Sequence, residues 1–408
     1  METMSVEITT GPPEVRIPAS AEVTDTVGTA EAVLSRRTGA PVRLADTEDL
    51  GGSERSVVMR VRVAETPFEL PRTLVLKHYG ECADSELSDP FAHEAASCQL
   101  ATALPPEIRV GPELIAHDPG QRLLVLEDLG RGSTLADVLL ADDARAAERA
   151  LLSWARALGR LHTTMAGREA DFDALMRRLG TKSWTDPVAN DIERATTDLP
   201  ELLAGSLGLD TPPAVRDRLT TAAELLGSSR YRSFSPSDIC PDNSLVTGNG
   251  VRFLDFEWGC VRDIVLDAAY LQFPFPSSWC SYALPESLAE QMLSTWRSEV
   301  VEVWPDLDDD EVLVPRLLDA QLLWVWVSTW WFLPREGQRD TPIDLHMPSP
   351  RRSTALVDRW RRLHADSASA GRADVEEYAS QMVEALVERF GSGALHLQPY
   401  PAFREAES

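Results

Sequence analysis

Oxygen-bearing side chains flank a short predicted hairpin in the segment Ser235 to Trp258. Its Asn249-Gly250 dipeptide lies between two apolar runs, which is a strong local signal for a β-hairpin. Asp238 and Asn243 precede the first strand, and Asp255 follows the second, with Glu257 close behind. Because a hairpin brings its ends together, we expect these side chains to converge. Such oxygen ligands suit a hard divalent cation, and Mg²⁺ takes a few carboxylates together with phosphate oxygens and water.

A lysine inside an apolar strand is the second chemical feature. Lys77 stands in the apolar run from Leu74 to Tyr79, where burial of an unpaired ammonium would be costly. It therefore needs a carboxylate or a phosphate as a partner. Glu94, early in the next predicted helix, can face back across that strand. The alternative is a lysine at the edge of the sheet and an unrelated surface glutamate.

A glycine-rich segment precedes this strand. Gly51-Gly52-Ser53 lies in a polar stretch, residues 49–56, between predicted strands at 42–44 and 57–63. Backbone N–H groups of such a turn can lie over phosphate groups. A plain hairpin turn would contain the same residues, so this feature alone does not indicate a nucleotide site.

Composition narrows the class of partner. The formal net charge is −26, from 39 Lys+Arg and 65 Asp+Glu. This balance disfavours nucleic acid or an anionic membrane as the main partner, because phosphate binding needs a basic face. It is compatible with a cationic substrate, although acidic side chains also keep a surface soluble. The oligomeric state stays open.

Cysteine usage and the chain start indicate a reducing compartment. The five cysteines contain no C-x-x-C pair and are odd in number, so we expect buried or free thiols rather than disulfides or a zinc site. The first residues show no secretory signal. The apolar stretch from Leu317 to Leu333 is short for a membrane span and carries Asp319 and Gln321, which predicts a buried core helix. A cytoplasmic enzyme fits these observations.

The elements that must position these residues fall into two groups. We predict a flexible leader over residues 1–24, a β-rich lobe over 25–128 with one notable helix at 90–104, and a helical lobe over 129–408. In the second lobe, apolar residues at a helical period predict a long helix over 144–165. The fold class is therefore α+β, with a small lobe followed by a large one and a junction near Glu127 to Arg131.

In their order and spacing, these pieces resemble the aminoglycoside phosphotransferase-like family, a phosphotransferase branch of the protein-kinase-like fold. That family has a glycine-rich turn and a lysine–glutamate pair in its small lobe, and a loop H-G-D-x-x-x-x-N followed by I-D-F/W-E in its large lobe. The resemblance runs from about residue 25 to residue 335. It matches Gly51-Gly52-Ser53 to the turn, Lys77 and Glu94 to the pair, Asp238 through Asn243 to the catalytic loop, and Leu254 through Glu257 to the metal loop; Asp263 and Asp267 match acids that often follow.

The resemblance implies a bilobal kinase that uses ATP and Mg²⁺. Lys77 would hold the α- and β-phosphates and Glu94 would direct it, while the backbone of Glu127-Asp128-Leu129 would meet adenine. Asn243 and Asp255 would ligate Mg²⁺, with Glu257 as a secondary ligand at best. Asp238 would orient, or accept the proton from, the hydroxyl that attacks the γ-phosphate.

One position departs from the family. Pro236-Ser237 stands where the family has His-Gly, and the family histidine mainly supports the metal loop. The substitution therefore bears on the rigidity of the loop more than on its chemistry. Since every residue that would carry charge or ligate metal is present, we predict an active kinase.

The sequence leaves three functions open, which differ in the phosphate acceptor or in having none. The first is a hydroxyl of a small metabolite or antibiotic, cationic or neutral. The second is a Ser/Thr hydroxyl of a peptide in natural-product biosynthesis. The third is a pseudokinase that binds nucleotide or a partner without turnover. Four acidic residues are either contacts for ammonium groups of an acceptor or ordinary helix surface: Asp173, Asp186, Asp191 and Glu193.

Overall fold

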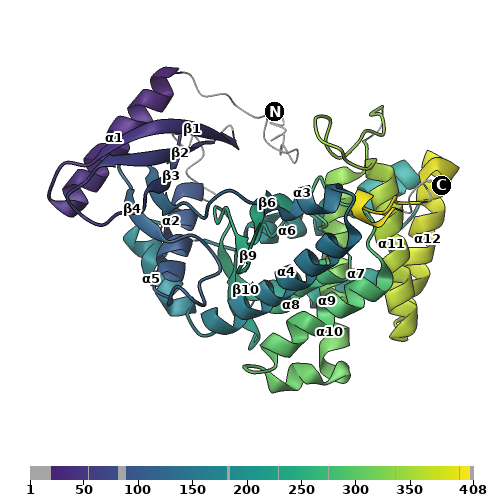
Figure 1. Cartoon of the computed structure of the whole chain (residues 1–408). Coiled ribbons are helices and arrows are strands. Elements are labelled where there is room, and N and C mark those ends of the chain that lie inside the picture. The colour runs from purple at the N-terminus through teal and green to yellow at the C-terminus, as the bar shows by residue number, and fades with distance from the viewer. Residues whose placement is uncertain are drawn as a thin grey trace, which may run out of the picture. The chain divides into compact units, whose positions relative to one another are not determined.

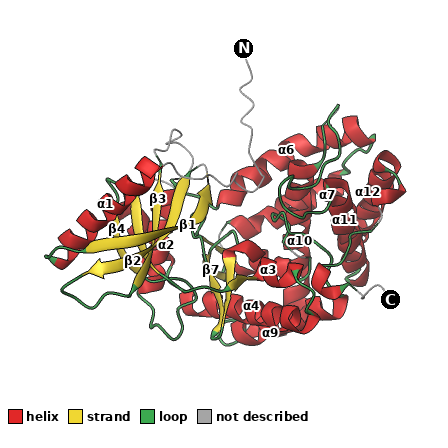
Figure 2. Cartoon of the chain, turned by 45° about the horizontal axis from the view of Figure 1, so that its top comes forward, coloured by secondary structure: helices red, strands yellow, loops and turns green. Residues whose placement is uncertain are grey.

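The computed structural model describes residues 20–53, 55–80, 89–181, 184–227, 229–273, 275–335, 337–394 and 396–404. They form two compact units. Unit 1 takes the chain up to Arg131 together with Asp171–Trp184, and unit 2 takes Gly132–Ala170 and the chain from Thr185 on. The large sheet belongs to unit 1 and most helices to unit 2, as the colours of Figure 2 show. The predicted α+β class, with a small β-rich part and a larger helical part, is confirmed.

Unit 1 is built on one antiparallel sheet of five strands in the order β1-β2-β3-β5-β4. The strands are β1 (Arg43–Ser53), β2 (Ser56–Glu65), β3 (Thr73–Tyr79), β4 (Leu114–Asp118) and β5 (Leu123–Glu127). Helix α1 (Ser20–Thr38) lies along this sheet (Figure 1), and its Ala30, Val33 and Leu34 join the apolar core of the strands. The remaining helices are α2 (Pro90–Thr102), beside β4, and α5 (Glu169–Arg178).

The ends of unit 1 differ from the sequence-based prediction. The predicted leader, residues 1–24, overlaps α1, which begins at Ser20; residues 1–19 lie outside the described part of the chain. Residues Asp171–Trp184 group with unit 1 instead of the predicted second lobe, 129–408. Phe172 contributes one contact to this grouping, because its side chain is buried and its ring centroid lies 6.4 Å from that of His93 on α2.

The glycine-rich segment is strand rather than turn. Gly51 pairs with Val58 and Gly52 with Val57, so β1 continues to Ser53 and the connection to β2 is only residues 54–55. The predicted turn over 49–56 is therefore wrong. Positive φ angles of 92° at Gly51 and 155° at Gly52 accompany the register shifts of this strand, which is how a strand accommodates residues that usually mark a turn.

Unit 2 is organised around helix α10 (Asp310–Phe332), which packs against α6, α7, α8 and α11. Trp324 and Trp326 on this helix are buried, which confirms the predicted core helix. None of the helices in the described ranges is long and apolar enough to cross a membrane. The other helices are α3 (Leu135–Leu140), α4 (Ala144–Met165), α6 (Pro187–Leu207), α7 (Pro213–Ala222), α8 (Ile264–Ala268), α9 (Glu286–Val300), α11 (Arg352–Ser369) and α12 (Ala373–Phe390). Helices α11 and α12 lie side by side (Figure 1).

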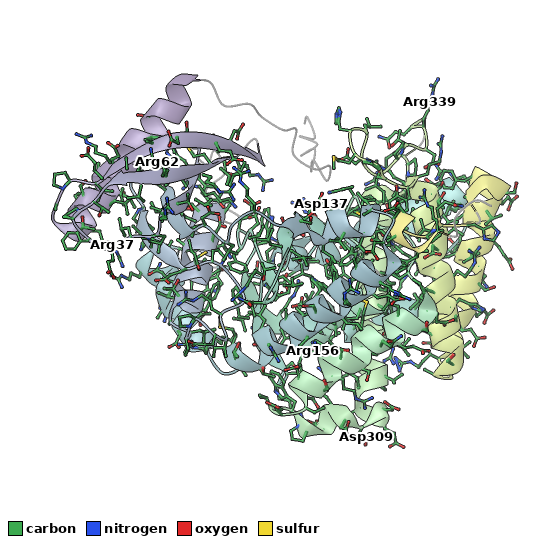
Figure 3. All side chains as sticks on the ribbon, viewed as in Figure 1. Arg37, Arg62, Asp137, Arg156, Asp309 and Arg339 are labelled. Carbon is green, nitrogen blue, oxygen red and sulfur yellow. The ribbon has the colours of Figure 1, made fainter. Side chains whose placement is uncertain are left out.

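Two aspartates near helix N-termini, Asp309 and Asp137, are labelled in Figure 3. Asp309 is the N-cap of α10 and accepts a hydrogen bond from the backbone N–H of Glu311 at 2.8 Å. Asp137, in the first turn of α3, exchanges hydrogen bonds with Thr134 in a capping box. Such carboxylates satisfy backbone donors that a helix leaves unpaired at its start. Single 3₁₀ turns occur at Ala223–Leu226, Pro241–Asn243, Ala269–Leu271, Pro305–Asp308, Ser392–Ala394 and Pro401–Phe403.

Two small ladders in unit 2 frame the segment that carries the candidate chemistry. Strand β7 (Arg232–Ser235) pairs antiparallel with β10 (Cys260–Asp263), and β8 (Ser244–Thr247) lies between β6 (Ser133–Thr134) and β9 (Gly250–Phe253). The hairpin β8–β9 closes through the pair Thr247↔Gly250, as the Asn-Gly signal predicts. The loops 236–243 and 254–259 therefore leave from ladders that fix both of their ends.

Candidate active site

A tight turn aims the first candidate residue, Asp238. Its backbone N–H donates to the carbonyl of Pro236 at 2.8 Å, and the residue between them, Ser237, has φ of +65°. A left-handed conformation at a non-glycine residue costs about 1–3 kcal/mol and persists only where neighbouring structure imposes it. Part of that support comes from Ser235, whose hydroxyl accepts the N–H of Ser237 at 2.9 Å.

The next turn of the loop brings Asn243 onto Asp238. The 3₁₀ turn Pro241–Asn243 folds the chain back, and the amide Nδ2 of Asn243 donates to Oδ2 of Asp238 at 2.9 Å. Pro241 suits this role because its fixed φ fits the first position of a helical turn. The other carboxylate oxygen, Oδ1 of Asp238, is buried and has no hydrogen-bond partner among the described residues.

Asp255 follows the second strand of the hairpin. The N–H of Leu254 donates to the carbonyl of Asn243 at 2.8 Å, which ties the start of this segment to the loop 236–243. Asp255 itself is a second non-glycine residue with a left-handed backbone, φ +56°. Its negative charge acts on Asp238: burial first, then the charges of Asp242 and Asp255, raises the pKa of Asp238 to about 6. Glu257 lies half-buried two residues further on.

Asp242 is a member of this group that the sequence motif treats as a spacer. Nε1 of Trp279 donates to its Oδ2 at 3.1 Å, while its Oδ1 is buried with no hydrogen-bond partner in the described part of the chain. Burial, together with the charge of Asp255, raises the pKa of Asp242. In the sequence, only its position directly before Asn243 indicates that Asp242 could belong to this group.

The donor set fits a cation that arrives with a phosphate. Within the described ranges, no three His, Cys, Asp or Glu side chains gather closely enough to hold a metal by themselves. Mg²⁺ in phosphate-transferring sites needs only one or two carboxylates, and phosphates and water complete its shell. The buried Oδ1 atoms of Asp238 and Asp242 are oxygens without a partner in the described structure, and Asn243 and Asp255 add further oxygens. These residues fit Mg²⁺ bound together with a nucleotide.

Unit 1 contains the predicted lysine–glutamate pair. Nζ of Lys77 lies 2.9 Å from Oε2 of Glu94, and their side chains are 6% and 2% exposed. The hydroxyl of Tyr79 donates to the same oxygen, and Nζ lies 5.2 Å from the centroid of the Tyr79 ring. Desolvating two charges is costly, so a buried pair of this kind is weak evidence for stability alone and fits a site that uses its charge.

The glycine-rich segment shows a structural constraint in place of an open phosphate cradle. A Cβ at Gly52 would lie 2.3 Å from the backbone oxygen of Ser56, so glycine is required where β1 and β2 approach each other. The N–H of Gly51 already donates to the carboxylate of Asp49 at 2.9 Å. A contact of Gly51, Gly52 or Ser53 with phosphate stays a prediction.

The side chains of the predicted lobe junction are used within unit 1. Arg60 donates to both oxygens of Asp128, at 2.8 and 3.0 Å, and Glu127 exchanges two hydrogen bonds with the backbone of Glu113. These contacts fix the path of the segment up to Leu129. A contact of this segment's backbone with adenine stays a prediction.

Two of the four acids considered as acceptor contacts have internal hydrogen-bond partners. Asp186 caps α6 through the N–H of Val188 at 2.9 Å, and Asp191 accepts a hydrogen bond from Nε1 of Trp331 at 3.0 Å. Burial raises the pKa of Asp191. Glu193 is exposed on α6, and Asp173 belongs to unit 1. The structure thus gives Asp186 and Asp191 internal partners, and acceptor binding by any of the four remains a prediction.

The four cysteines within the described ranges are buried: Cys98, Cys240, Cys260 and Cys280. Cys82 lies outside those ranges. Burial raises the pKa of the Cys240 thiol well above its ordinary value, and its Sγ lies 3.3 Å from the hydroxyl of Ser277. The neutral thiol lies against Asp238, and its hydrogen bond with that carboxylate opposes the rise in the Asp238 pKa.

Solved structures similar to this chain share little sequence with it. A thermostable mutant of the aminoglycoside phosphotransferase APH(4)-Ia is 16% identical, with 88% of this chain and 98% of that chain covered and a TM-score of 0.40. A choline kinase from Cryptosporidium parvum Iowa II is 13% identical, with coverage of 90% and 95% and a TM-score of 0.45. A choline/ethanolamine kinase family protein from Mesorhizobium loti is 16% identical, with coverage of 85% and 93% and a TM-score of 0.43. No curated protein matches the chain.

The sequence itself matches a family model. The model described as "Phosphotransferase enzyme family" covers residues 50–309, which is more than half of the 408 residues. The matched range includes the lysine–glutamate pair, the catalytic loop and the hairpin described above. The chain belongs to the phosphotransferase enzyme family.

Proposed function

We propose that this protein transfers the γ-phosphate of ATP to a hydroxyl group of a small molecule, with Mg²⁺ as cofactor. The observation that carries the proposal is the convergence around Asp238 in unit 2. Its Oδ2 is held by Asn243, its Oδ1 is buried without a partner among the described residues, and the charge of Asp255 acts on it. Family membership supports the reaction class.

The chain's residues would supply position and charge, because phosphoryl transfer asks little covalent work of a protein. Lys77, directed by Glu94, would bind the α- and β-phosphates. Asn243 and Asp255 would hold Mg²⁺, with Glu257 as a secondary ligand, and the cation supplies charge neutralisation as the γ-phosphoryl group transfers. Asp238 would accept a hydrogen bond from the acceptor hydroxyl on Oδ1 and take its proton as the oxygen attacks.

The acceptor we propose is a small hydroxylated metabolite or antibiotic that is neutral or cationic. Besides burial, the charges of Asp242 and Asp255 raise the pKa of Asp238, and the charge of Asp255 raises the pKa of Asp242. An anionic group beside the attacking hydroxyl would add to this repulsion. The net charge of −26 acts in the same direction at longer range.

A ligand screen followed by mass spectrometry tests this function. Ligands that bind the native state raise its melting temperature by mass action, so the purified protein is first screened with ATP–Mg²⁺ and a panel of hydroxylated metabolites, antibiotics and peptides. Compounds that raise the melting temperature further are then incubated with ATP–Mg²⁺, and a mass increase of one phosphoryl group is sought. A phosphorylated small molecule supports the proposal. A phosphorylated peptide would instead identify a peptide kinase, and nucleotide binding without any product a pseudokinase.

A further inference from the structure

A buried arginine, Arg262, forms hydrogen bonds with the turn that precedes Asp238. Where the family has His-Gly, this chain has Pro236-Ser237, and Ser237 adopts φ +65°, a conformation suited to glycine. Pro236 has no N–H to donate and offers no side-chain hydrogen bond. The strained conformation of Ser237 therefore needs hydrogen-bond partners from outside residues 236–238.

Arg262, on β10, supplies two of them. Its Nη1 donates to the hydroxyl of Ser237 at 3.2 Å, and its Nη2 donates to the backbone carbonyl of Ser237 at 3.3 Å. The side chain is 1% exposed, and its guanidinium carbon lies 5.8 Å from the centroid of the Trp324 ring. Both acceptors belong to Ser237, the residue directly before Asp238. The guanidinium therefore contacts the backbone at the point from which the candidate base, Asp238, projects.

The guanidinium is itself fixed by buried acids. Its Nε donates to Oδ1 of Asp267 at 2.9 Å, Nη2 donates to the same oxygen, and Nη1 lies 3.6 Å from Oδ2 of Asp186. Asp267 is fully buried. The charges of Asp267 and Asp186 hold the pKa of Arg262 above its ordinary value despite burial, so it stays a cation.

A histidine on α4 fixes the acid in turn. Nε2 of His162 lies 2.9 Å from Oδ2 of Asp267, and Nε1 of Trp296 on α9 lies 3.0 Å from Nδ1 of His162. An indole N–H can only donate, so Nδ1 is the acceptor and Nε2 carries the proton donated to Asp267. Side chains of α9, α4 and α8 thus form a chain of hydrogen bonds that ends at Arg262.

We infer that Arg262 is the positioning residue of the catalytic loop: it fixes Ser237 in the left-handed conformation and thereby aims Asp238. The inference rests on the proposed phosphotransfer. A planar guanidinium presents several N–H groups in a rigid fork, so it can bind Asp267 with one side and Ser237 with the other, which an ammonium cannot reproduce. Arg262 thus supports the loop 236–243 at the position where Pro236-Ser237 replaces the family's His-Gly.

The competing explanation is that Arg262 only neutralises two buried aspartates. Arg262→Lys separates the explanations, because lysine keeps a positive charge beside Asp267 and Asp186 and loses the fork. A matched control is Arg316→Lys, since Arg316 pairs with the fully buried Asp263 and donates to Ser229, neither of which is in the loop.

We expect both lysine variants to lower the melting temperature, but only Arg262→Lys to lower kcat. A small displacement of a catalytic group from a remote change can cost on the order of 100-fold, and we expect a loss of that order with KM for ATP changed less than about threefold. In Arg262→Lys, the added change Ser237→Gly should restore part of kcat, because glycine adopts the required φ without strain.

Backbone amide hydrogen exchange gives a readout that needs no activity. Protection of the peptide spanning residues 235–243 should fall in Arg262→Lys and stay at the wild-type level in Arg316→Lys. If Arg262→Lys does not fold, Ser237→Ala replaces it in this test. That variant removes one acceptor of Arg262 and leaves its buried charge pairs intact, so the protection of residues 235–243 should fall by a smaller amount. Equal kcat and equal exchange in the two lysine variants would overturn the inference. A wild-type protein that phosphorylates no acceptor would overturn the proposed function, while the exchange data would still decide the role of Arg262.

Discussion

At the scale of single residues, the candidate site depends on which carboxylate oxygens have partners. Asp238 has one oxygen held by Asn243 and one without a partner among the described residues, and Asp242 repeats that pattern with Trp279. The motif D-x-x-x-x-N identifies Asp238 and Asn243 from the sequence. It does not identify Asp242, because a spacer position carries no expectation until the 3₁₀ turn is known to bring it back beside Asp238.

Asp242→Asn should weaken the affinity for Mg²⁺ without removing the reaction. The amide can still accept the hydrogen bond from Trp279, but one negative charge beside the cation site is lost, and cation affinity depends on ligand charge. We expect the Mg²⁺ concentration for half-maximal activity to rise about 3- to 10-fold with a small change in kcat. Titration of activity with Mg²⁺ at saturating ATP measures this. An unchanged midpoint would show that Asp242 does not contribute to the cation site.

Variants of the pair Lys77–Glu94 can separate its effect on stability from its role in phosphotransfer. Lys77→Met leaves Glu94 buried without its cation, which should cost about 3–5 kcal/mol of unfolding free energy. The double variant Lys77→Met, Glu94→Gln removes both charges and should recover most of that loss. Urea denaturation measures the stability of both variants, and both should have lost phosphotransfer. Activity retained by the double variant would exclude Lys77 from nucleotide binding.

At the scale of elements, local signals predict the structure where they agree with the tertiary environment. The Asn-Gly hairpin and the long helix over 144–165 appear as predicted, because turn chemistry and helical periodicity are local properties. Strand β1 was missed beyond residue 44. Its Gly-Gly pair signals a turn locally, but pairing with β2 extends the strand through both glycines.

Gly52→Ala should destabilise unit 1. The new Cβ would meet the backbone oxygen of Ser56 at 2.3 Å, at a φ of +155° that an alanine rarely adopts, and we expect a loss of about 1–3 kcal/mol. Gly248→Ala is the matched control, because Gly248 lies in the turn of the other hairpin with nothing within 4 Å of an added Cβ. Thermal and urea unfolding of the two variants measure the difference. Equal stabilities would contradict the close approach of β1 and β2.

At the scale of the whole molecule, the order of the motifs along the chain predicts the class of fold. The contacts that hold Arg262 are not predictable in this way, because their residues lie far apart in the sequence. The succession of motifs from Gly51 to Asp267 is sufficient to assign the family, which the family model over residues 50–309 confirms. Arg262 pairs with Asp186, the N-cap of α6, and with Asp267 on α8, which in turn contacts His162 on α4. No local pattern links these residues, so only the folded chain shows that the loop is held without the family histidine.

The net charge makes a prediction about acceptors. With a formal charge of −26, the protein attracts cationic molecules over distances that salt screens, so KM for a cationic acceptor should rise with ionic strength. KM for a neutral acceptor of similar size should change little. Steady-state kinetics at increasing concentrations of KCl compare the two. Identical salt dependence would show that the acidic surface serves solubility alone.

The central claim is that Asp238 acts on the acceptor hydroxyl while other residues bind the nucleotide. The most direct measurement compares the wild type with Asp238→Asn, using calorimetry for ATP–Mg²⁺ binding and single-turnover assays for phosphoryl transfer, with the exposed cap variant Asp309→Asn as control. We predict that Asp238→Asn lowers the transfer rate by about 10²- to 10⁴-fold, changes ATP affinity less than about threefold, and leaves the melting temperature near that of the control. Full turnover by Asp238→Asn would contradict the account.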